Sequence, residues 1–206
     1  LEGEGANDSH CGSADPLRGA KMMTWEGGIR VPTVMRWPGK IMAGHTSDQI
    51  MSSMDLYPTF IELAGAELPV GRTIDGVDQT EFLLGERDQS ARDQFYYYAA
   101  THLHAVRWQN WKLVRQRVAD PDHLGWWGRM VDEVPELTLY DLGNDIAETA
   151  NVAADHPQVV QKMQELIEKA RTELGDWDVI GKGARIFDDA PLLTAKEIEQ
   201  NRNNRA

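Results

Sequence analysis

The sequence of 206 residues predicts a mixed α/β fold whose second half is a small four-stranded antiparallel sheet followed by a helix. Two observations carry this prediction. Four short segments rich in aromatic and aliphatic side chains follow residue 94, and an apolar stripe at helical spacing comes after them. A hydrophobic content of 41% is enough for a core, and the length allows one large domain or two small ones.

The first half of the chain is expected to contain one strand and one helix between loops. Residues 1–20 are rich in Gly, Ser and Asp and are expected to form a loop. Residues 29–37 alternate well enough for a strand, which the following Pro-Gly pair ends. In residues 55–64 the apolar side chains recur at helical spacing, with Asp55 expected at the N-cap and a glycine after the last residue.

The second half begins after a polar linker, and we place a domain boundary there, between residues 1–88 and residues 89–206. Gln109 and Asn110 are expected to form a hairpin turn between two of the strands. A helix is expected over residues 157–174, and the polar tail after Leu193 is expected to fray. The expected strands are residues 95–99, 103–107, 111–115 and 137–142.

Charge and composition exclude several classes of function. The 21 basic residues against 33 acidic ones give a formal net charge of −12, which repels polyanions, so nucleic acid is not an expected partner. The single cysteine permits no internal disulfide. No run of apolar residues approaches the roughly 20 that a membrane span needs, so no membrane span is expected.

The most informative segment is residues 16–32, where two arginines, a lysine and a glutamate lie among three glycines. Cationic side chains beside glycines are suited to cradle a small tetrahedral anion, because glycine lets the backbone approach closely. Taken alone, such a segment is also an ordinary surface turn. Two interpretations are open for Glu26: it orders Lys21 or Arg30 as an ion pair, or it only caps the loop.

The continuation of this segment resembles the sulfatases of the alkaline-phosphatase-like superfamily. Their pattern is a lysine a few residues ahead of Thr-x-Glu-Gly-Gly-x-Arg-x-Pro, followed by Trp-Pro-Gly, and residues 21–39 match it. The resemblance extends from about residue 13 to about residue 188, and several blocks in the right order are more specific than any one. The further blocks are residues 53–59 with 63–65, 74–78 with 83–85, 105–108 with 111–113, and 139–142 with Asp145 and Glu148.

The resemblance implies both fold and activity. Residues 1–88 would be the C-terminal part of an alkaline-phosphatase-like α/β sandwich, and residues 89–206 a small C-terminal subdomain. The enzyme would be a sulfuric ester hydrolase of arylsulfatase type or acting on sulfated sugars, in which a hydrated formylglycine attacks sulfur and calcium holds the sulfate oxygens. Lys21 is the catalytic residue expected to contact sulfate or the leaving oxygen, and Arg18 and Arg30 are expected to help form its basic surroundings.

Two motifs of the family are missing here. Cys11 is followed by neither the proline nor the arginine of the Cys/Ser-x-Pro-x-Arg motif that carries the formylglycine, and no serine fits it. The paired Asp-Asp and Asp-Asn calcium ligands do not occur in their expected setting. We therefore expect a C-terminal portion of a longer enzyme, with formylglycine and calcium ligands upstream, no metal ligands in this chain, and no activity of the portion alone.

Two further groups are candidates for substrate binding. His102 and His104 lie two apart in an expected strand and so point to the same face. They either contact the substrate or are solvated sheet residues. Trp126 and Trp127 lie between glycines in an insertion, where they form a stacking platform for a sugar or aryl ring or else anchor the loop by burial.

Two rival functions stay open at this level. One is a phosphatase or phosphonate hydrolase of the same superfamily, since a fold alone does not decide function. The other is a non-catalytic homologue that binds sulfated glycans. The family suggests a periplasmic or extracellular location, and the sequence leaves the identity of the sulfate ester and the oligomeric state open.

Overall fold

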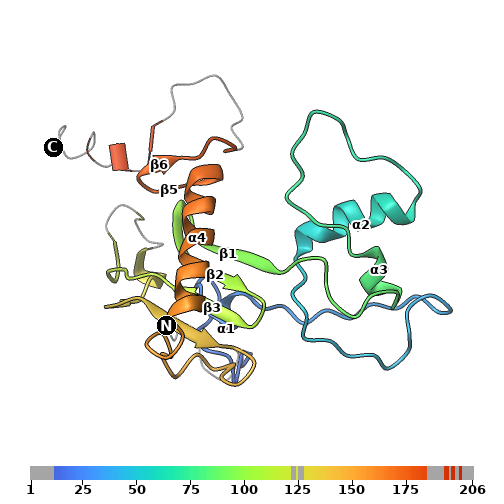
Figure 1. Ribbon diagram of the computed structural model, residues 1–206, viewed down its shortest axis with the longest axis horizontal. Helices are drawn as coiled ribbons and strands as arrows, with labels where there is room; N and C mark the ends of the chain where they lie inside the picture. The colour runs from blue at the N-terminus through green and yellow to red at the C-terminus, as the bar shows by residue number, and fades with distance from the viewer. Residues whose placement is uncertain are drawn as a thin grey trace. The chain divides into compact units, whose positions relative to one another are not determined.

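The computed structural model describes residues 12–121, 124, 128–184, 193–194, 196–197 and 200. The chain divides into two compact units: one is Val31–Phe95, and the other joins Leu1–Arg30 to Tyr96–Ala206. We call them the 31–95 unit and the sheet unit (Figure 1). The boundary expected between residues 88 and 89 stays a prediction.

The sheet unit contains the expected four-stranded antiparallel sheet, in the order β1-β2-β3-β4. In its central pairs Val106 lies opposite Leu113, and Leu113 lies opposite Leu139. The β2–β3 hairpin turns at Gln109, whose φ of 53° is the left-handed conformation that a tight hairpin turn needs. The strands are β1 (Gln94–Ala99), β2 (His102–Trp108), β3 (Trp111–Val114) and β4 (Thr138–Asp141).

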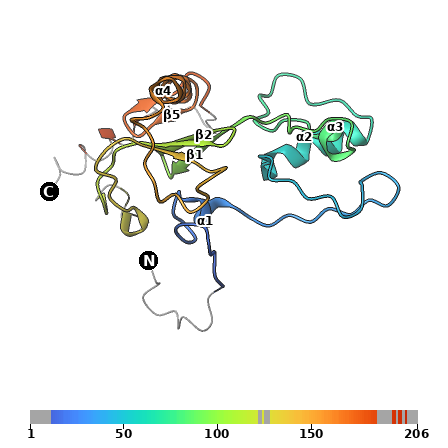
Figure 2. The same ribbon diagram turned by 60° about the horizontal axis from the view of Figure 1, so that its bottom comes forward.

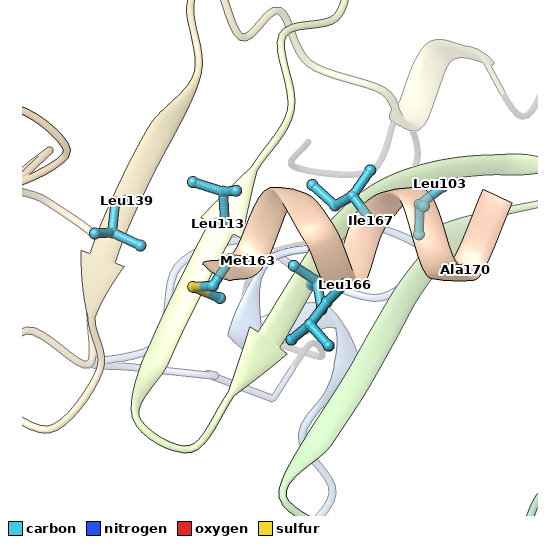
Figure 3. Packing of buried hydrophobic residues seen from close by; sticks show 8 residues of the cluster. Leu103, Leu113, Leu139, Met163, Leu166, Ile167 and Ala170 are labelled. Atoms are coloured by element: carbon cyan, nitrogen blue, oxygen red, sulfur yellow. The ribbon is translucent and has the colours of Figure 1, made fainter. Parts of the chain in front are cut away.

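Helix α4 (Pro157–Glu173) covers one face of this sheet, and the segment with α1 (Glu26–Ile29) lies on the other face (Figure 2). Proline suits the first turn of α4 because its missing N–H would have no partner there. The apolar stripe of the helix meets the sheet in one buried cluster (Figure 3). Its members are Leu103, Val106, Leu113, Leu139, Met163, Leu166, Ile167 and Ala170.

The end of α4 is tied back to the sheet by a short ladder, β5 (Gly175–Asp176) with β6 (Val179–Ile180). The sequence analysis did not predict this ladder. Gly175, with φ 101°, ends the helix as expected. The buried Asp176 accepts hydrogen bonds from the backbone N–H of Leu103 at 3.0 Å and from Arg115 at 2.7 Å, so the helix end and β2 are held together.

The strand expected over residues 29–37 is wrong. Ile29 ends the short helix α1, which the backbone N–H of Arg30 closes by donating to the Glu26 carbonyl, and residues 31–37 form no regular structure. The physical reason is that a strand is stable only when its backbone groups pair with a neighbour. No described segment pairs with these residues, so alternation alone does not make them a strand.

The 31–95 unit contains a 3-10 turn, η2 (Ser53–Asp55), and two helices, α2 (Leu56–Leu63) and α3 (Thr80–Leu83). Helix α2 confirms the helix expected there, whereas α3 was not predicted. Asp55 is the N-cap residue of α2 as expected, but its side chain makes no capping hydrogen bond there; it forms a capping box with Ser52 at the start of η2. The Asp55 carboxylate is also buried against Arg92 at 2.5 Å.

No helix within the described residues is long and apolar enough to cross a membrane.

Candidate functional site

The loop that carries Lys21 packs closely against α1. A Cβ atom at Gly28 would lie 2.2 Å from the carbonyl oxygen of Met23, so only glycine allows this approach. Lys21 itself is exposed, and it makes no hydrogen bond or ion pair with the part of the chain that the structure describes. Toward the described residues, the Lys21 ammonium group therefore makes no pair.

Glu26, five residues further on, is fully buried and accepts from several donors. Arg30 Nε lies 2.6 Å from one carboxylate oxygen, and Tyr97 donates its hydroxyl to the other at 2.7 Å. Arg107 is a weaker partner at 3.5 Å. Of the ion pairs considered for Glu26, the structure has the one with Arg30.

Lys112 on β3 is a functional neighbour that the sequence analysis missed. Its ammonium is fully buried, 3.0 Å from Glu26, 2.7 Å from Glu148 and 2.9 Å from the carbonyl oxygen of Thr24. Glu148 in turn accepts from the backbone N–H of Glu26 at 2.8 Å. One feature of the sequence could have indicated a buried lysine: Lys112 lies between Trp111 and Leu113 in an interior strand, and one face of such a strand has to be buried.

The pKa values of Glu26 and Glu148 shift in opposite directions in this environment. Burial favours protonation of Glu26, but Lys112, Arg30 and Tyr97 outweigh it and lower its pKa to about 2. Burial dominates at Glu148 and raises its pKa despite Lys112. Glu26 is therefore strongly favoured in its ionised form, and it pairs with Arg30 and Lys112.

Trp25 lies between two guanidinium groups. The Arg18 guanidinium lies 3.5 Å from the ring centroid and that of Arg117 lies 5.2 Å from it, which are cation–π contacts. The indole N–H donates to Asp132 at 2.8 Å, and Arg117 pairs with the same carboxylate at 2.6 Å. The loop before α1 and the segment after β3 thus both contact Trp25.

His104 on β2 is brought to the Lys21 loop. Its Nδ1 lies 3.1 Å from the Thr24 hydroxyl, and the ring is 5% exposed, so it is not a solvated sheet residue. Leu103 and Val106 both belong to the cluster under α4, so the strand alternation shifts between them and His104 turns to the opposite side. Burial, then Arg117, then His102 lower the pKa of His104 to about 3.

His102 has a different surrounding. Its ring stacks on Trp177, with centroids 5.6 Å apart and planes 13° apart, and lies 6.3 Å from the His104 ring. Trp126 and Trp127 lie outside the described residues. The structure therefore joins Lys21, Glu26, Arg30 and His104 to one region of the sheet unit, whereas His102 faces Trp177 beside it.

The region offers an exposed cation, a buried neutral imidazole and a rigid ionic scaffold beneath them. Such an arrangement can bind an anion and donate to its oxygens. It does not by itself provide a metal centre, because the described ranges contain no group of three or more His, Cys, Asp or Glu side chains that could hold a metal ion.

Comparison with known families identifies one match, "N-sulphoglucosamine sulphohydrolase, C-terminal", over residues 20–173. Among curated proteins, rat (Rattus norvegicus) steryl-sulfatase is 46% identical over 102 residues, which is 50% of this chain and 18% of that protein. Rat arylsulfatase G is 35% identical over 164 residues, which is 76% of this chain and 30% of that protein. The chain thus spans less than a third of the length of either relative.

A solved structure from Bacteroides thetaiotaomicron, described in terms of the metabolism of multiple glycosaminoglycans, is similar with a TM-score of 0.62 and 29% identity. The similarity covers 76% of this chain and 32% of that one. The family match over residues 20–173 includes most of the glycine-rich segment and the sheet with α4.

Proposed function

This chain belongs to the N-sulphoglucosamine sulphohydrolase, C-terminal family, and on that premise we propose that the complete enzyme is a sulfatase that hydrolyses aryl or carbohydrate sulfate esters. One observation supports this most. The buried His104 hydrogen-bonds to Thr24, three residues after Lys21, which is exposed and has no partner among the described residues. The loop that carries Lys21 is thereby tied to a hydrogen-bonding ring on β2, and a cation beside such a ring suits a sulfate ester.

Lys21 is the proposed catalytic residue of this chain. As the sulfur–oxygen bond breaks, the leaving oxygen gains negative charge, and a compact ammonium group stabilises it. The absence of any described partner for Lys21 supports this role, since its charge is not neutralised by the protein.

Arg18 and Arg30 have a supporting role in this proposal. Arg18 is held by Trp25 and by the carbonyl oxygen of Glu148, and Arg30 is held by Glu26. Because both guanidinium groups already have partners, they shape the loop that presents Lys21 and add to its positive potential.

The substrate contacts proposed for this chain are Lys21, His102, His104, Trp126 and Trp127. His104 is the one with the most structural support, because its Nε2 has no partner among the described residues. The stacked pair of His102 and Trp177 offers an aromatic surface that suits a sugar or aryl ring.

Calcium and a formylglycine nucleophile do not fit the described residues, which contain no candidate metal cluster. We propose that both belong to a part of the enzyme outside these 206 residues, in line with the length of the relatives. The 206-residue chain alone is then expected to hydrolyse no sulfate ester.

The test is an assay of the complete enzyme with an aryl sulfate, a sulfated monosaccharide and an aryl phosphate. We expect turnover of the sulfates, and Lys21→Ala should lower kcat/KM by a factor on the order of 10²–10³, the usual loss for a preorganised donor to a developing oxyanion. Lys21→Arg should also lower kcat/KM, because a planar guanidinium group does not replace a compact ammonium group.

Lys162→Ala is the matched control, since this lysine is half exposed on α4 and its ion pair with Glu165 is 3.9 Å long. Unchanged kcat/KM in Lys21→Ala would contradict the catalytic role. Turnover of the phosphate ester alone would replace the sulfatase by a phosphatase, and binding of a sulfated glycan without turnover would replace it by a non-catalytic homologue.

A further inference from the structure

His104 and Thr24 form an isolated buried pair. His104 is 5% exposed and Thr24 is 6% exposed, and 3.1 Å separates Nδ1 from the hydroxyl oxygen. Within the described ranges this is the one hydrogen bond of either side chain. Thr24 is also fixed through its backbone, because Lys112 Nζ donates to its carbonyl oxygen at 2.9 Å.

The direction of this hydrogen bond follows from counting donors. If Nδ1–H donated to Thr24, the threonine hydroxyl would still carry its own proton, buried and with no acceptor among the described residues. A buried donor without an acceptor is costly. This arrangement leaves the Nε2–H donor instead, but Nε2 is not among the described buried polar atoms that lack a partner, so its proton can reach water or a ligand. The favoured arrangement therefore has the Thr24 hydroxyl donating to Nδ1, and a neutral ring then carries its proton on Nε2.

The surroundings of the His104 ring disfavour its charged form. Arg117, which lies 5.2 Å from the Trp25 ring beside Thr24, and His102 both oppose a positive charge on His104. Burial has the largest effect and, with Arg117, His102 and Arg115, lowers the pKa of His104 to about 3, whereas Asp132 acts in the opposite direction. The imidazole therefore offers Nε2–H as an uncharged donor at neutral pH.

We propose that His104 donates a hydrogen bond from Nε2 to an oxygen of the sulfate ester, and that Thr24 is the positioning residue that fixes this tautomer and the ring orientation. The role rests on the proposed sulfatase function. In this proposal Lys21 and His104 have different roles in substrate binding. Lys21 supplies a positive charge, and His104 supplies a directional hydrogen bond from an uncharged ring, which does not change with pH.

The first test does not depend on activity. The complete enzyme is labelled with ¹⁵N-histidine, the His104 signals are assigned with a His104→Gln variant, and the ring nitrogens are observed at pH 7. We expect a protonated Nε2 and an unprotonated Nδ1, and in Thr24→Val a mixture of the two tautomers. A protonated Nδ1 or a charged ring in the wild type would overturn the inference.

The second test compares kinetics on the sulfate ester that the wild type hydrolyses. Thr24→Val, which keeps the shape and removes the hydroxyl, should lower kcat/KM by about 3- to 10-fold, the range of one ordinary hydrogen bond. Thr24→Ser, which keeps the hydroxyl, should stay near the wild type. Thr101→Val is the matched control, because exposed Thr101 lies 3.5 Å from His102 Nδ1, too far for a firm hydrogen bond.

Thr24→Val with wild-type spectra and wild-type kcat/KM would overturn the inference, and so would Thr24→Ser as impaired as Thr24→Val. A wild-type enzyme that hydrolyses no sulfate ester would overturn the proposed function and the substrate contact of His104. In that case the spectra alone would still confirm or overturn the tautomer and the role of Thr24.

Discussion

The sheet unit and the 31–95 unit differ in what they bury. The sheet unit has a continuous apolar cluster between β2, β3, β4 and α4, and a buried ionic network on the other face of the sheet. In the 31–95 unit none of the Ala, Val, Ile, Leu, Met, Phe, Trp or Tyr side chains is buried. Its buried side chains are Asp55, Pro58, Thr59, Gln79 and Ser90.

The 31–95 unit instead displays apolar surface. Val34 is 94% exposed, Val31 79% and Phe60 59%. A hollow of about 270 Å³ lies within this unit, lined by apolar side chains with one arginine. Exposed apolar side chains of this number are typical of a surface that another part of a protein covers. We infer that the sheet unit is a folded scaffold and that the 31–95 unit needs the rest of the enzyme.

The largest expected difference between the units is in hydrogen exchange of the isolated 206-residue chain. Amides of β3 and α4 should exchange at least about 10³-fold more slowly than those of residues 31–50, because only the former lie over a buried apolar core. The measurement is exchange followed by mass spectrometry at peptide resolution. Equal protection of both units would contradict the comparison.

The next prediction concerns the ionic network of the sheet unit. Lys112→Met leaves Glu26 and Glu148 buried without their shared cation, and we expect the free energy of unfolding of the sheet unit to fall by about 3–5 kcal/mol. Denaturation followed by tryptophan fluorescence measures it. Lys162→Met on the exposed side of α4 is the control and should change stability by less than about 0.5 kcal/mol.

A pair of apolar truncations compares the units directly. Met163 is fully buried between α4 and the sheet, so Met163→Ala should lower the free energy of unfolding by about 2–5 kcal/mol. Phe60 is 59% exposed in α2, so Phe60→Ala should cost less than about 1 kcal/mol in the isolated chain. In the complete enzyme, Phe60→Ala should lower the free energy of unfolding by more than this, if the rest of the protein covers the Phe60 side chain. The same small cost in both would argue against a covering partner.

The smallest expected effect is the dependence of stability on pH. The pKa of His104 falls from 6.5 to about 3 on folding, so below pH 6.5 the unfolded state binds a proton that the folded state does not. Stability of the sheet unit should therefore decrease as pH falls from 7 to 5, by about 1.4 kcal/mol per unit below the unfolded pKa. Subtracting the curve of His104→Gln isolates this contribution, and coincident curves would contradict the neutral buried ring.

The elements that the sequence predicts correctly are those with a local signal. Helix α4 has its apolar stripe, its first-turn proline and its closing glycine, and the four strands have their β-branched and aromatic side chains. The strand over residues 29–37 failed because pairing is a property of two segments, and the alternation of one segment says nothing about its neighbour.

The same distinction applies to the candidate site. The spacing of Lys21, Glu26 and Arg30 in one short loop identified the region and one ion pair, Glu26 with Arg30. The contacts of Thr24, Lys112 and Glu148 in the site were missed because they join residues 36 to 122 positions apart along the chain, and such contacts carry no local pattern. The shift of alternation on β2 that turns His104 toward Thr24 is equally invisible in the sequence.

The central claim is that the Lys21 loop and His104 form one side of a sulfate ester site in the complete enzyme. The most direct measurement is an experimental structure of that enzyme with inorganic sulfate or a sulfate ester bound. We predict Lys21 Nζ and His104 Nε2 within hydrogen-bond distance of oxygens of the same ligand, with Nδ1 of His104 still bonded to Thr24. A ligand bound away from the Lys21 loop, or a His104 ring turned so that Nε2 contacts only protein, would contradict the claim.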